Sequence, residues 1–136
     1  MKIVTWNVNS INARIEHLVR FIKKDQSDIY LIQELKCINE SFPYAEIENL
    51  GYISYVEGQK AWNGVAILSK TKLKILNKKI PTFSEDMQSR FLETEIKINA
   101  IKKPIKLFCI YLPNGNPIDT EKFDYKIKWM KKFNEY

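Results

Sequence analysis

A strand-helix-strand pattern over residues 1–34 constrains the fold of this chain more than any other feature. Residues 3–6 and 29–33 are short, continuously apolar runs of the kind found in buried strands. Between them, apolar side chains recur at helical spacing, namely Ile11, Ile15, Leu18, Val19 and Ile22. A unit of this length makes a right-handed parallel crossover, so both strands are predicted to end at the same edge of a sheet.

The pattern beyond residue 50 is that of a sheet with antiparallel neighbours. Apolar runs separated by turn-like segments, such as 99–104, predict strands at 52–57, 65–69, 73–80, 91–98 and 105–112, and a short helix at 43–50 precedes them. A last helix is predicted over residues 120–136, with Phe123, Ile127, Met130 and Phe133 on its buried face. Neither a repeat nor a flexible linker divides residues 1–136, which predicts part of one mixed α/β domain.

Composition and charge narrow the class of protein. A hydrophobic fraction of 45% is typical of a globular domain, and the net charge of +6 favours a polyanionic partner such as nucleic acid. Because the lysines are spread along the chain, solvated faces would explain them equally well. Cys37 and Cys109 have no metal-ligand spacing, no apolar run is long enough for a membrane span, and no leader precedes residue 3. These features predict a cytoplasmic protein without membrane association.

Each strand of the crossover ends at a side chain that could bind a metal ion. Asn7 ends the first strand and Glu34 follows the second. Open α/β sheets assemble their sites at the carboxyl ends of strands, and a hard cation such as Mg²⁺ takes oxygen ligands. An amide and one carboxylate would form one wall of such a site. Alternatively, Asn7 caps a turn and Glu34 is a surface acid.

An ordered series of motifs over nearly the whole chain resembles the exodeoxyribonuclease III family of abasic-site endonucleases. The motifs are KIVTWNVNSI at 2–11, LIQELK at 31–36, GY at 51–52, GQK at 58–60, WNGVAILS at 62–69, QSR at 88–90 and YLPNG at 111–115. This family belongs to the endonuclease/exonuclease/phosphatase superfamily. The resemblance implies a partial four-layered α/β sandwich of the deoxyribonuclease I type, with flanking helices outside the sheets. It also implies Mg²⁺- or Mn²⁺-dependent hydrolysis of the phosphodiester 5′ to abasic sites in duplex DNA, and 3′-5′ exonuclease action.

The resemblance further implies roles for individual residues. Glu34 matches the metal-binding glutamate of the family, and Asn7 matches the asparagine that organises the metal and the phosphate. Tyr111 matches the active-site tyrosine, whose hydroxyl lies close to the phosphate. Without the resemblance, Tyr111 would be interpreted as an aromatic side chain that packs at a strand end.

Further residues are expected near DNA, namely Arg90, Lys36, Asn63 and Asn114. For three of them a structural explanation stays open: Arg90 could form a salt bridge, Lys36 could be solvated, and Asn114 could form a turn. Trp62 could stack or simply pack, and it is expected in the core or at the rim of the site rather than as a residue that reads bases. His17 does not match the catalytic histidine of the family and is assigned no role.

The later motifs of the family have no counterpart in these residues. Gly-Asp-x-Asn, the aspartate that orients the attacking water, and Ser-Asp-His are missing. We therefore expect the N-terminal portion of one such domain, inactive alone, with apolar side chains exposed on the inner face of its sheet. A separate chain with the C-terminal half is one source of the missing groups. Two alternatives stay open: a non-catalytic remnant that binds DNA or a partner, and a phosphatase of the same superfamily.

Overall fold

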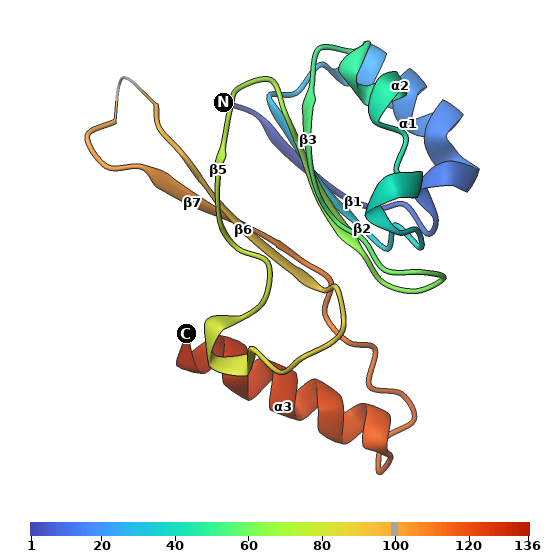
Figure 1. Cartoon of the computed structure of the whole chain (residues 1–136), viewed down its shortest axis with the longest axis vertical. Coiled ribbons are helices and arrows are strands. Elements are labelled where there is room, and N and C mark those ends of the chain that lie inside the picture. The colour runs from blue at the N-terminus through green and yellow to red at the C-terminus, as the bar shows by residue number, and fades with distance from the viewer. Residues whose placement is uncertain (99–100) are drawn as a thin grey trace.

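The computed structural model describes residues 1–98 and 101–136, which form two sheets between outer helices (Figure 1). The first sheet has the order β1-β2-β4-β3 and contains β1 (Ile3–Asn7), β2 (Ile29–Gln33), β3 (Ile53–Glu57) and β4 (Val65–Ser69). The second has the order β5-β6-β7 and contains β5 (Lys74–Asn77), β6 (Phe91–Ile96) and β7 (Ile105–Ile110). Helices α1 (Ile11–Asp25) and α2 (Tyr44–Glu48) lie outside the first sheet, and α3 (Glu121–Glu135) lies on the opposite side of the molecule. The predicted layered α/β fold is confirmed.

The crossover at the start of the chain forms as predicted. β1 pairs with β2 in parallel, from Ile3 opposite Ile29 to Asn7 opposite Gln33. The intervening α1 is capped by Ser10, whose hydroxyl accepts a hydrogen bond from the backbone N–H of Ala13. Because the pairing is parallel and in register, Asn7 and the residue after Gln33 lie at the same edge of the sheet.

The two sheets pack face to face through a common apolar core. Its buried members are Ile29, Val65, Ile67, Leu73, Leu92, Ile96, Leu107 and Cys109. The expectation that the inner face of the first sheet lies exposed is therefore wrong for β2 and β4, because a second sheet from the same chain covers them. It holds at the edge strand β1, where Ile3 on the inner face remains 40% exposed.

Several predicted elements end earlier than expected. The strand at 73–80 stops at Asn77, since a 3₁₀ turn over Pro81–Phe83 follows closely and proline cannot donate to a ladder. The strands at 91–98 and 105–112 stop at Ile96 and Ile110. The turn expected at 99–104 includes residues 99 and 100, which lie outside the described residues.

The buried face of α3 differs in part from the predicted one: Phe133 packs against the core as predicted, but Met130 does not. Trp129 is 2% exposed and packs with Phe133 at 5.6 Å between ring centroids, whereas Met130 is 45% exposed. Tyr125, Trp129 and Phe133 recur every four residues and pack in one cluster with Phe83 and with Phe91 of the second sheet. The helix therefore carries two apolar stripes that share Phe133, and the one that contains Trp129 faces the core because the large indole removes more apolar surface from water.

Both cysteines are free and buried, and burial raises the pKa of the Cys109 thiol to about 12, so this thiol is an inert core group. No helix in residues 1–98 and 101–136 is long and apolar enough to cross a membrane.

Candidate functional site

Ends of strands from both sheets converge at one edge of the molecule. Glu34 follows β2, Tyr111 follows β7, and Arg90 precedes β6. The backbone N–H of Tyr111 donates to the carbonyl of Arg90 at 2.9 Å, and that of Gly64 donates to the carbonyl of Ser89 at 2.8 Å. The second of these bonds ties the start of β4 in the first sheet to the segment that leads into the second sheet.

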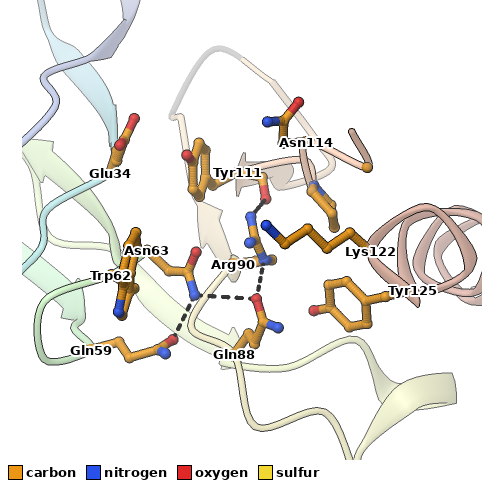
Figure 2. A pocket seen from close by; sticks show the side chains of 12 residues that line it. Glu34, Gln59, Trp62, Asn63, Gln88, Arg90, Tyr111, Asn114, Lys122 and Tyr125 are labelled. Atoms are coloured by element: carbon orange, nitrogen blue, oxygen red, sulfur yellow. Dashed lines mark hydrogen bonds between the residues drawn. The ribbon is translucent and has the colours of Figure 1, made fainter. Parts of the chain in front are cut away.

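A pocket of about 500 Å³ lies at this convergence (Figure 2). It is lined by Glu34, Gln59, Trp62, Asn63, Gln88, Arg90, Tyr111, Pro113, Asn114, Gly115, Lys122 and Tyr125. Asn7 and Lys36 flank Glu34 without lining the pocket, and Asn7 opens onto a neighbouring groove beside Trp6 and His17. The structure thus brings together most of the residues predicted from the sequence.

The backbone around Glu34 adopts an uncommon conformation. Glu34 has a φ of 63° and Lys36 a φ of 55°, both in the left-handed region. The N–H groups of Leu35 and Lys36 donate to the carbonyls of Gly64 and Asn63 at 3.1 and 2.9 Å. A left-handed non-glycine residue costs on the order of 1–3 kcal/mol, and such residues cluster at functional sites. The loop therefore presents the carboxylate to the pocket at some cost in stability.

The carboxylate of Glu34 is held in its ionised form. Its side chain is 19% exposed, and the Lys36 ammonium lies 3.0 Å from Oε1. Burial raises the pKa of Glu34, but hydrogen bonds from Lys36 and Asn7, the charge of Lys36 and a hydrogen bond from Tyr111 together bring this pKa below its ordinary value. The pocket consequently offers a negatively charged oxygen ligand at neutral pH.

Arg90 holds the aromatic ring of Tyr111 in place. Its guanidinium carbon lies 4.8 Å from the centroid of the Tyr111 ring and 5.8 Å from that of Tyr125. Nε donates to Oε1 of Gln88 at 2.7 Å, and Nη1 donates to the carbonyl of Tyr111 at 3.2 Å. Burial raises the pKa of Tyr111, the nearby Glu34 carboxylate raises it further, and Arg90 opposes both. The phenol therefore stays protonated and faces Glu34 (Figure 2).

Other predicted residues occupy the walls and rim of the pocket. The side-chain amide of Asn63, 8% exposed, donates to Oε1 of Gln59 at 2.9 Å and to Oε1 of Gln88 at 3.2 Å. Asn114 is exposed, and its side-chain oxygen accepts a hydrogen bond from Asn116 at 2.9 Å, as in a turn. Trp62 is 68% exposed, so it lies at the rim and not in the core.

Among the polar side chains of the pocket, Gln59, Gln88, Lys122 and Tyr125 received no role from the sequence. Gln59 and Gln88 lie within recognised motifs, and Lys122 and Tyr125 come from the first turns of α3 (Figure 2). The spacing of Lys122 and Tyr125 places both on one side of a helix, and this is the only sequence feature that could have pointed to a shared role. The direction in which α3 returns toward Tyr111 depends on tertiary packing, so the sequence could not assign them.

The donor atoms at Glu34 fit one wall of a site for a hard cation. The Glu34 carboxylate is a ligand that Mg²⁺ accepts, and Mg²⁺ keeps several waters. The side-chain oxygen of Asn7 accepts a hydrogen bond from the backbone N–H of Asn9 at 3.0 Å, as in a turn, while its amide nitrogen donates to Glu34, so Asn7 orients the carboxylate. Within the described part of the chain, no group of three or more His, Cys, Asp and Glu side chains could hold a metal ion. Glu34 thus supplies part of a coordination shell.

Comparisons with known proteins agree with the layered fold. Exodeoxyribonuclease III of Haemophilus influenzae is 36% identical over 141 residues, which covers 100% of this chain and 51% of that protein. Among solved structures, the 3′ phosphatase NExo from Neisseria bound to product DNA hairpin superposes with a TM-score of 0.92 at 32% identity. An AP endonuclease from Archaeoglobus fulgidus superposes with a TM-score of 0.89, also at 32% identity.

The similarity covers all of this chain and part of each relative. The two solved structures are covered to 51% and 50% of their length, so the chain spans about half the length of the relatives that it matches. The model of the endonuclease/exonuclease/phosphatase family matches residues 4–121, which include the Glu34 loop, Arg90 and Tyr111. The chain belongs to the endonuclease/exonuclease/phosphatase family.

Proposed function

We propose that this chain is the N-terminal portion of a DNA repair nuclease of the exodeoxyribonuclease III type. The observation that carries the proposal is the meeting of an ionised Glu34 and a protonated Tyr111 in one pocket with Arg90 and Lys122. The substrate is duplex DNA, hydrolysed 5′ to an abasic site or trimmed from its 3′ end. The relatives at 36% and 32% identity support this class of substrate.

Each residue contributes to binding of the scissile phosphate. Glu34, oriented by Asn7, would hold a divalent cation, Mg²⁺ or Mn²⁺, which when bound neutralises charge that develops on the phosphate. Tyr111 donates a hydrogen bond to a phosphate oxygen, and Arg90 keeps its ring in position. Lys36 lies beside the carboxylate and offers a point charge to the DNA backbone.

Two further asparagines, Asn63 and Asn114, would support or contact DNA at the edge of the pocket. Asn63 braces the pocket wall through Gln59 and Gln88, which leaves its role toward DNA indirect. Asn114 lies on the exposed turn after Tyr111, where its side chain and the neighbouring backbone can face a phosphate. The overall charge of +6 adds sequence-independent attraction.

We expect the chain to be inactive without further polypeptide. Hydrolysis needs an activated water together with a positioned phosphate, and groups that act as a unit lose orders of magnitude in rate when some are missing. β1 and β7 are terminal strands of their sheets within the described residues, and β2 contacts β7 across the core, so both open edges lie on one side of the sandwich. A polypeptide that corresponds to the other half of the relatives, in the same protein or as a separate chain, would add its strands there.

An incision assay tests this function. A labelled duplex with one abasic site is incubated with Mg²⁺ and the purified chain, alone or mixed with a polypeptide that corresponds to the remaining half of an exodeoxyribonuclease III. We expect incision only in the mixture, and its loss in the Glu34→Ala variant. Glu34-dependent incision by the chain alone would refute inactivity, and incision that survives Glu34→Ala would refute the assigned role of Glu34.

A second candidate is removal of a 3′ phosphate from DNA. The Neisseria relative that superposes at a TM-score of 0.92 is a 3′ phosphatase bound to a DNA hairpin. The same mixture, given a 3′-phosphorylated primer, would release inorganic phosphate if this reaction is the main one. A non-catalytic binding role would be favoured by a different result. In that case neither reaction occurs, and the chain binds DNA in a salt-sensitive way that neither Glu34→Ala nor chelation of metal changes.

A further inference from the structure

Trp62 exposes a large aromatic ring beside the proposed catalytic groups. Its side chain is 68% exposed, whereas Trp129 in the core is 2% exposed. Trp62 lines the same pocket as Glu34 and Tyr111, on the side of the first sheet (Figure 2). Because most of its surface is exposed, the indole gains little from packing within the described residues, and its position beside the pocket points to a ligand that covers it.

The loop that carries Trp62 is fixed on both sides of the ring. Ala61 and Asn63 have φ values of 64° and 52°, so the backbone turns sharply around the tryptophan. The Asn63 amide is bound by Gln59 and Gln88, and the Ser89 hydroxyl donates to the carbonyl of Gly58 at 2.9 Å. A ring presented from such a braced loop loses little conformational entropy when a ligand binds.

We propose that Trp62 is a stacking platform for an unpaired nucleobase of the DNA strand whose phosphate lies at Glu34. This inference deepens the proposed function and rests on it. Every nucleobase offers a π face, so such a platform tolerates any sequence and favours frayed ends, gaps and single-stranded stretches. Lys60 and Lys122 are exposed near the ring and at the pocket, where they attract the adjoining phosphates.

The surroundings of Trp62 fit a nucleobase better than a protein partner. The pocket combines Pro113, an apolar surface, with the amides of Gln59 and Asn114, which can hydrogen-bond to the edges of a base. Next to Trp62 the loop is polar and small, with Lys60 and Ala61 on its N-terminal side. A stable protein interface requires a larger contiguous apolar area than one ring provides.

Binding measurements with two matched oligomers test the proposal. The full chain is titrated with dye-labelled single-stranded oligothymidine, and with a sugar-phosphate oligomer of the same length that lacks bases. The variants are Trp62→Ala, Trp62→Phe and, as a control on the outer side of the first sheet, Tyr44→Ala, whose ring is 42% exposed. Fluorescence anisotropy gives the affinity, and melting curves confirm that every variant folds.

Base-dependent binding is the expected outcome. Trp62→Ala should weaken binding of oligothymidine by roughly tenfold or more and change binding of the base-free oligomer by less than about twofold. Trp62→Phe should keep most of the affinity, and Tyr44→Ala should change neither oligomer. An equal loss for both oligomers, no loss for either, or wild-type protein that binds neither overturns the proposal.

Failure of the stacking proposal and failure of the proposed nuclease function give different results. If the Trp62 variants behave as expected but the mixture shows no Glu34-dependent incision, the stacking site stands and the nuclease function is rejected. If incision depends on Glu34 and Trp62→Ala does not distinguish the oligomers, the nuclease function stands and the platform is rejected.

Discussion

At the scale of single residues, the site depends on groups that hold the backbone of Glu34 in an unfavourable left-handed conformation. The sequence indicated Glu34, Asn7 and Lys36 by their motifs, but not the left-handed φ values of 63° and 55° at Glu34 and Lys36. Backbone strain of this kind is set by neighbouring loops, here through the bonds to Asn63 and Gly64. It could not be read from local propensity.

The ion pair with Lys36 should control the protonation of Glu34. In Lys36→Met the hydrogen bond and the positive charge beside the carboxylate are lost, while the burial that raises the pKa of Glu34 remains. We expect this pKa to rise in the variant. An NMR titration of the Glu34 carboxyl carbon measures the pKa, with Lys60→Met as a control at an exposed lysine. An unchanged pKa in Lys36→Met would contradict the assigned ion pair.

Residue 64 should have to be glycine, because it packs closely against the loop that carries Glu34. It has a φ of 88°, and a Cβ there would lie 2.9 Å from the Cβ of Leu35. Gly51 has a similar φ of 83° but no atom within 4 Å of its would-be Cβ, so Gly51→Ala measures the strain of the backbone alone. We expect Gly64→Ala to reduce the free energy of unfolding by about 1–3 kcal/mol more than Gly51→Ala. Urea unfolding tests the difference, and equal losses would rule out the clash.

At the scale of elements, the strands and helices were largely predictable, whereas the faces that they bury were predicted less well. The crossover follows from the spacing of apolar residues in α1, of which Ile11, Leu18 and Ile22 are buried. α3 offers two apolar stripes, and only its packing on Phe91 decides between them. Helical periodicity gives no direction in space when two faces are apolar.

The aromatic stripe of α3 should anchor the helix. We expect Trp129→Ala to reduce the free energy of unfolding by roughly 3–5 kcal/mol, because Trp129 is 2% exposed and its removal leaves a cavity. Met130→Ala, at the next position and 45% exposed, should cost less than about 1 kcal/mol. Urea unfolding of both variants tests the assignment, which would be wrong if the two losses were equal or reversed.

At the scale of the whole molecule, a buried carboxylate connects the second sheet to the end of the chain. Glu93 on β6 is fully buried, and its Oε1 lies 3.0 Å from the Lys106 ammonium on β7. Its Oε2 accepts hydrogen bonds from Asn77 of β5 at 2.6 Å and from the Tyr136 hydroxyl at 2.7 Å. Three strands and the residue after α3 therefore depend on one negative charge.

This network should make the fold sensitive to acid. Burial raises the pKa of Glu93, but the hydrogen bonds from Asn77 and Tyr136 and the ion pair with Lys106 bring it below its ordinary value. The stability that Glu93 contributes is present above the unfolded-state pKa of about 4.3 and is lost as pH falls through the lower folded-state pKa. We expect the urea concentration at the midpoint of unfolding to decrease once the pH is below about 4. In Glu93→Gln this midpoint should depend less on pH. An identical acid dependence in both proteins would exclude Glu93 as a cause.

The amino-acid sequence by itself determined the parallel crossover, the order of the strands along the chain and the placement of Asn7 and Glu34 at one edge. Periodicity and turn residues are local properties, so they can be read without a structure. Tertiary structure alone decided that the later strands form a second sheet, that α3 brings Lys122 and Tyr125 into the pocket, and that Trp62 remains exposed. These features depend on contacts between segments far apart in the chain, where buried area and steric fit select one arrangement among several that the local pattern allows.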